Sequence, residues 1–76
     1  MNKLITESID AREQEVSDYQ FNIDNYALAL KKIEESGDLE LEPFKKQLEG
    51  LIKTERYEQK KAKIMLEVMK DRIGER

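Results

Sequence analysis

Apolar side chains recur along the first half of the chain in alternating steps of four and three residues. The series is Ile5, Ile9, Arg12, Val16, Tyr19, Ile23, Tyr26, Leu30 and Ile33, with Arg12 as its one charged member. Steps of this size place side chains on one face of an α-helix, as the a and d positions of a heptad do. The pattern therefore predicts a helix over about residues 5–36 and no strand.

A second helix with the same periodicity is predicted after a short break. Gly37 can take the left-handed backbone conformation that closes a helix, and Pro43 suits the first turn of the next one. We expect a connector at 37–42 and a helix over about 43–73. Its stripe is wider than that of the first helix, and Glu55 and Gln59 interrupt it. The stripe comprises Phe44, Leu48, Leu51, Ile52, Glu55, Gln59, Ala62, Met65, Leu66, Met69 and Ile73.

Two helices of equal length and a short connector predict one domain, residues 1–76, that folds as an antiparallel hairpin with coiled-coil-like packing. Charge favours the same pairing, because residues 1–42 carry a net charge of −7 and residues 43–76 one of +4. Folding the chain at residue 39 predicts the cross-helix pairs Leu30–Leu48, Tyr26–Ile52, Ile23–Glu55, Tyr19–Gln59, Val16–Ala62, Arg12–Leu66 and Ile9–Met69. In this register the Tyr19 and Tyr26 hydroxyls could bond to Glu55 and Gln59.

The composition restricts the chemistry. A chain of 76 residues with no cysteine and no histidine has no disulfide, no zinc or haem ligands of the usual kinds, and no Ser/His/Asp or Cys/His set. We therefore expect no enzymatic activity, no cofactor and no small-molecule substrate. There is no apolar run of membrane-spanning length and no apolar leader, which predicts a cytoplasmic protein. A domain this small gains stability from oligomerisation or from very regular helix packing.

The two apolar stripes face each other in the predicted hairpin and form a seam between the helices. Other apolar residues lie away from this seam and are also spaced seven residues apart. They are Phe21 and Leu28 in the first helix, and Tyr57 and Ile64 in the second, where Gly50 continues the series. A helix that is apolar on two faces needs two neighbours, and a hairpin supplies one. We interpret this set as an oligomer or partner interface, which would give a homodimeric four-helix bundle or a docking site for another helix. The alternative is that these are isolated surface residues without a function.

Charged residues form three further sets. The acidic set Glu7, Asp10, Glu13, Glu15 and Asp18 could dock on a basic protein or be simply solvated. The basic set Lys53, Arg56, Lys60, Lys61 and Lys63 could contact nucleic acid, although the acidic first helix offers compensating charge. Arg12, Glu55 and Gln59, with Glu58 beside them, form a polar layer on the seam, which we interpret as fixing register and not as catalytic.

Together these patterns predict a non-catalytic protein–protein interaction or regulatory module. We expect it to form a homodimer and to bind another protein, as small accessory proteins of bacteria or phages do. Nucleic-acid association through the basic set is the alternative. The identity of the partner and the orientation of the dimer stay open at this point.

Overall fold

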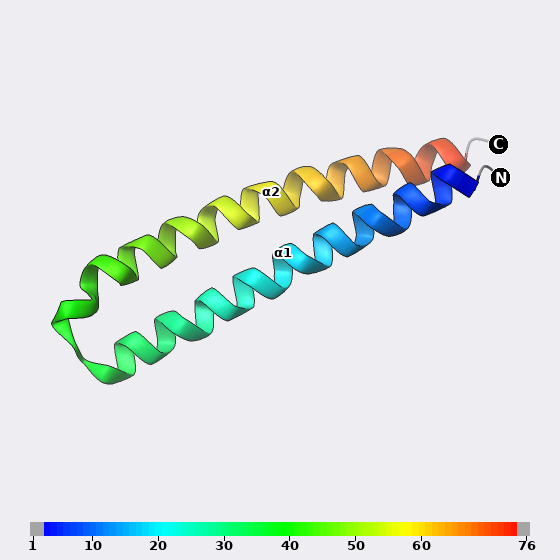
Figure 1. Cartoon of the computed structure of the whole chain (residues 1–76). Helices are drawn as coiled ribbons and strands as arrows, with labels where there is room; N and C mark the ends of the chain where they lie inside the picture. Colours follow the sequence, from blue (N-terminus) through cyan, green and yellow to red (C-terminus); the bar gives the residue numbers. More distant parts are fainter. Residues whose placement is uncertain (1–2, 75–76) are drawn as a thin grey trace.

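The computed structural model is a helical hairpin (Figure 1). It describes the backbone of residues 3–74 and the side chains of residues 8–73. Helix α1 spans Lys3–Ser36, the short 3-10 helix η1 spans Leu39–Leu41, and helix α2 spans Glu42–Gly74. The two long helices run antiparallel, so the start of α1 and the end of α2 lie at the same end of the hairpin (Figure 1). The predicted all-α hairpin is confirmed, and the expected connector contains one turn of 3-10 helix.

The turn between the helices is built from local hydrogen bonds. Gly37 has a φ of 64°, a conformation that costs a residue with a side chain about 1–2 kcal/mol. The Ser36 hydroxyl donates to the Ile33 carbonyl at 2.7 Å and accepts from the Asp38 amide at 3.2 Å. The Asp38 carboxylate then accepts from the Glu40 amide at 2.9 Å and caps η1. The chain therefore leaves α1 and reverses direction with the amides of Asp38, Glu40 and Leu41 bonded within the turn.

The core is a narrow seam along the two facing helices. Its buried apolar residues are Ile23, Ile33, Leu48, Ile52 and Ala62, and Gln59 is buried among them. All six belong to the predicted stripes. Cross-helix hydrogen bonds join Asn22 with Glu55 and Gln20 with Gln59, one residue from the partners that the antiparallel register predicts. The register expected from the sequence is therefore close to the observed one.

The wider part of the second stripe is not covered. Phe44, Leu51 and Met65 are between 37 and 47% exposed, so the expectation that they share the seam with Leu48 and Ile52 is wrong. Each precedes a seam position by one residue, a rotation of about 100° around the helix. A single partner helix covers a band narrower than that, and the stripe therefore extends beyond α1.

The hairpin is long and thin, with extents of 57 × 15 × 14 Å. None of the helices formed by residues 3–74 is long and apolar enough to cross a membrane. Among the side chains that the structure describes, two ion pairs tie the helices together, Lys45–Glu34 and Lys70–Glu13, each at 3.8 Å. Both join a basic residue of α2 to an acidic residue of α1, as the opposite net charges of the two halves predict.

Candidate interaction surfaces

The polar layer predicted on the seam centres on Gln59. Its side-chain amide donates to the Val16 carbonyl and to the Gln20 side-chain oxygen, each at 3.1 Å. Glu55 accepts from the Asn22 amide at 3.5 Å. Arg12 bonds to Glu15 on its own helix at 3.0 Å. The layer thus combines hydrogen bonds across the seam with one ion pair beside it.

Tyr19 lies among carboxylates of both helices. Its pKa is raised above its ordinary value of 10.0, first by partial burial and then by Glu15, which accepts its hydrogen bond, with further contributions from Glu58 and Glu55. The bond expected between a tyrosine hydroxyl and Glu55 or Gln59 is not among the described hydrogen bonds. Glu55 accepts from Asn22, Gln59 donates to Val16 and Gln20, and the Tyr19 hydroxyl bonds to Glu15. The register between the two helices, inferred from the sequence, identifies which residues face each other to within one position. It does not determine in which direction each side chain points.

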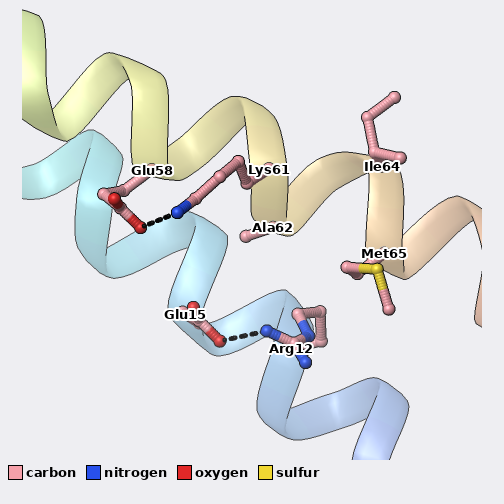
Figure 2. Close-up of a pocket in the computed structure, with 7 residues that line it drawn as sticks. All are labelled: Arg12, Glu15, Glu58, Lys61, Ala62, Ile64 and Met65. Atoms are coloured by element: carbon pink, nitrogen blue, oxygen red, sulfur yellow. Dashed lines mark hydrogen bonds and ion pairs between the residues drawn. The ribbon is translucent and has the colours of Figure 1, made fainter.

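A shallow groove of about 520 Å³ opens beside this layer (Figure 2). Glu15 and Glu58 lie on its two sides, and each is bound by a cation of its own helix. Arg12 holds Glu15 and Lys61 holds Glu58, both at 3.0 Å. The Glu58 carboxylate also raises the pKa of Lys61, mainly through this hydrogen bond. The groove therefore presents compensated charge next to the apolar side chain of Met65 (Figure 2).

The five residues predicted as an oligomer or partner interface are all on the surface. Phe21, Leu28, Tyr57 and Ile64 are between 58 and 66% exposed, and a Cβ at Gly50 would have nothing within 4 Å. They do not form one surface, however. Each precedes a seam residue by two positions, about 200° around its helix. Phe21 and Leu28 therefore face away from α2, and the residues of α2 face away from α1.

We call these two separate surfaces the α1 edge (Phe21, Leu28) and the α2 edge (Gly50, Tyr57, Ile64). The exposed Val68, four residues after Ile64, lies between the α2 edge and the side that carries Met65, because it immediately precedes the seam residue Met69. Lys61 lies over the Tyr57 ring, 5.1 Å from its centroid, which joins a cation to this edge. Val68 could not be identified from a spacing of seven residues, because it lies only four residues after Ile64.

The predicted acidic face is partly used within the hairpin. Glu13 bonds to Lys70, Glu15 to Arg12, and Asp18 accepts from the Gln14 amide at 2.9 Å. Asp10 is exposed, and the side chain of Glu7 lies outside the described residues. Among the side chains that the structure describes, no three acidic groups are arranged to hold a metal ion.

The predicted basic face is exposed along α2. Lys61 is paired with Glu58, whereas no ion pair reaches Lys53, Arg56, Lys60 or Lys63 from the described part of the chain. The compensation expected from the acidic residues of α1 goes to Lys70 and Lys45 instead. Four cations therefore remain available to a partner.

Comparison with known proteins supplies no relative: no family model matches the chain, and no curated protein or solved structure is significantly similar to it.

Proposed function

We propose that this protein is a non-catalytic interaction module that forms a homodimer and binds another protein. The observation that carries the proposal is the exposure of large apolar side chains at heptad spacing on the outward sides of both helices. Packing within the hairpin does not use these residues. Large exposed apolar side chains repeated along one side of a helix are a feature of helices that bind a partner.

The two edges suit a partner that offers an apolar helix or groove. Phe21 and Leu28 are seven residues apart, so they project from one side of α1 about 10 Å from each other along the helix axis. Tyr57 and Ile64 repeat that spacing on α2, next to the cation of Lys61. A partner helix with apolar residues at the same interval would match either edge.

Cross-linking in cells tests the partner. A photoreactive residue in place of Leu28 should give a discrete product heavier than a dimer of this chain. The same residue in place of Ala27, which is exposed on another side of α1, is the matched control and should give none. Phe21→Glu should remove the Leu28 product. Equal labelling at both positions, or a product that Phe21→Glu leaves unchanged, would reject the α1 edge as a protein-binding site.

The four cations without ion pairs favour nucleic-acid association as a second candidate. Phosphate contacts through Lys53, Arg56, Lys60 and Lys63 would give an affinity that falls steeply with salt. Fluorescence anisotropy with labelled duplex and single-stranded DNA and RNA, at about 50 mM salt, tests this. Binding that is lost in Lys53→Glu/Lys60→Glu would support it, and the absence of binding to all of these probes would exclude it.

A further inference from the structure

The hairpin exposes more surface than a compact protein of its mass. Its accessible surface is 5973 Å², whereas a folded monomer of 9.0 kDa exposes about 4,850 Å². The difference is about 1,100 Å², and a standard protein–protein interface covers about 800 Å² on each partner. One additional interface would therefore bring the exposed surface of each chain close to that of an ordinary folded protein.

The two broad sides of the hairpin, which both helices share, differ in chemistry. On one side are the residues that follow seam positions, such as Glu13 and Lys70, which pair with each other. Glu34 also lies on this side and pairs with Lys45, which occupies a seam position at the start of α2. Glu49 and Arg56 line a shallow depression on this same side. A second copy placed here would displace water from many charged side chains, and burying ionic groups is costly even when they are paired.

The other broad side carries the uncovered part of the α2 stripe. Phe44, Leu51 and Met65 are spaced at multiples of seven, and each immediately precedes a seam position. The corresponding residues of α1 include Asn22 and the half-buried Ala29, whose short side chains let another helix approach closely. This side therefore alternates large apolar residues of α2 with small residues of α1.

Two acidic groups on this side are paired with cations of their own helix. Glu58 occupies the heptad position between Leu51 and Met65, and Lys61 binds it at 3.0 Å. Glu15 faces Glu58 across the groove and is bound by Arg12 (Figure 2). Met65 points toward α1 at the groove, whereas Ile64 points away from it (Figure 2). A partner that covers the groove would bury these two ion pairs, at a cost of the same kind. The opposite side is more heavily charged, because four cations there have no ion pair among the described residues: Lys53, Arg56, Lys60 and Lys63.

We infer that this side, formed by Phe44, Leu51 and Met65 of α2 with Ala29 of α1, is the surface that joins two copies of the chain into a four-helix bundle. A two-fold axis would pair the surface with itself, as in most homodimers. This inference rests on the self-association part of the proposed function and locates it. It leaves the α1 and α2 edges on the outside of the bundle, where a different protein can reach them.

Leu51→Glu and Leu28→Glu form a matched pair of variants for testing this assignment. Both replace a surface leucine by glutamate, one on the inferred interface and one on the α1 edge. Analytical ultracentrifugation should show the wild-type chain at twice 9.0 kDa. Leu51→Glu should raise the dissociation constant of the dimer by about tenfold or more. Leu28→Glu should leave it unchanged.

Circular dichroism on the same samples separates dissociation from unfolding. If Leu51→Glu loses its helical signal, Phe44→Glu provides the second variant, because Phe44 lies in the first turns of α2 beyond the buried core. Phe44→Glu should weaken the dimer and remain helical. A helical Phe44→Glu with wild-type dimerisation would overturn the inference.

The remaining outcomes distinguish the inference from the function on which it rests. Dissociation by Leu28→Glu but not by Leu51→Glu would place the dimer at the α1 edge and overturn the assignment while leaving self-association intact. A wild-type chain that is monomeric and helical at about 100 µM would overturn both the assignment and self-association. The protein-binding role of the α1 edge is decided separately, by the cross-linking experiment at Leu28.

Discussion

The side-chain amide of Gln59 lies 3.1 Å from the carbonyl oxygen of Val16 and donates a hydrogen bond to it. A polar side chain in the middle of α2 is thus bonded to the backbone of α1, at a point where Gln59 is 7% exposed. In a continuous α-helix the Val16 carbonyl also accepts the amide of Gln20, four residues on. Gln59 therefore supplies a second donor to a carbonyl that already has one.

Replacing Gln59 by leucine should stabilise the hairpin. The Val16 carbonyl keeps its helical hydrogen bond, and the exposed Gln20 amide can turn to water, so neither partner is left without a bond. Leucine adds apolar contact at a buried position, and we expect the free energy of unfolding to rise by about 1 kcal/mol. Urea denaturation at fixed protein concentration measures this. Gln14→Leu, at an exposed position of α1, is the control and should change stability by less than about 0.5 kcal/mol.

Gln59→Leu also tests what the polar layer does. If Gln59 selects the antiparallel register, the leucine variant should be more stable but less uniquely packed, because an apolar position tolerates a shifted partner. Its amide NMR spectrum should then show broadened or doubled signals around residues 16–20. A stabilised variant with one sharp set of signals would contradict this role, and a destabilised variant would show that the hydrogen bonds of Gln59 outweigh the added burial.

The hairpin itself could be predicted because its determinants are local. Steps of four and three define each helix, Gly37 and Asp38 define the turn, and equal helix lengths then specify the pairing. The uncovered positions of Phe44, Leu51 and Met65 could not be predicted in the same way. The width of an apolar stripe shows how much of a helix's own surface is apolar. It does not show whether one neighbouring helix or several will cover that surface.

The candidate interaction surfaces were predictable as residues but not as one interface. Phe21 and Tyr57 both lie off the seam, and periodicity identifies them without relating the direction of one helix to that of the other. Only after the helices are paired is it clear that these two residues face opposite ways. The carboxylates around Tyr19 illustrate the same limit, because Glu15 and Glu58 belong to different helices and meet only in the folded chain.

Leu48 should be the most sensitive leucine of the core. It is 3% exposed, whereas Leu39 in η1 is 81% exposed. Leu48→Ala leaves a cavity on the seam and should lower the free energy of unfolding by about 2–5 kcal/mol, a large part of the total for a small domain. Leu39→Ala deletes the same atoms from the surface and should have little effect. Thermal melts of the two variants compare them, and similar losses would show that Leu39 contributes to packing in solution.

Gly37 and Gly50 should respond to alanine in opposite directions. Gly37 has a positive φ, and Gly37→Ala should cost about 1–2 kcal/mol. Gly50 lies inside α2, where an added methyl group would meet no atom within 4 Å, and Gly50→Ala should stabilise the helix by about 0.5–1 kcal/mol. Chemical denaturation measures both changes. A destabilising Gly50→Ala whose effect grows with protein concentration would show that another backbone approaches this glycine in an oligomer.

The groups around the groove predict a loss of stability at alkaline pH. The pKa of Tyr19 is raised by partial burial and by Glu15, and that of Lys61 by its hydrogen bond to Glu58. Both groups hold their protons more tightly in the folded chain than in the unfolded one. Their contribution is therefore complete below their ordinary values of 10.0 and 10.5 and is lost as the pH rises through the folded pKa values.

Urea denaturation from about pH 8 to pH 11 should therefore show the unfolding midpoint falling once the pH passes about 10. Tyr19→Phe removes one of the two titrating groups, so its midpoint should fall less steeply over the same range. Tyr26→Phe removes a hydroxyl from the same seam but leaves the contacts of Tyr19 and Lys61 intact, and its slope should match that of the wild type. If Tyr19→Phe falls as steeply as the wild type, the proton on Tyr19 is not linked to folding, and the close approach of Glu15 and Glu58 to this hydroxyl does not persist in solution.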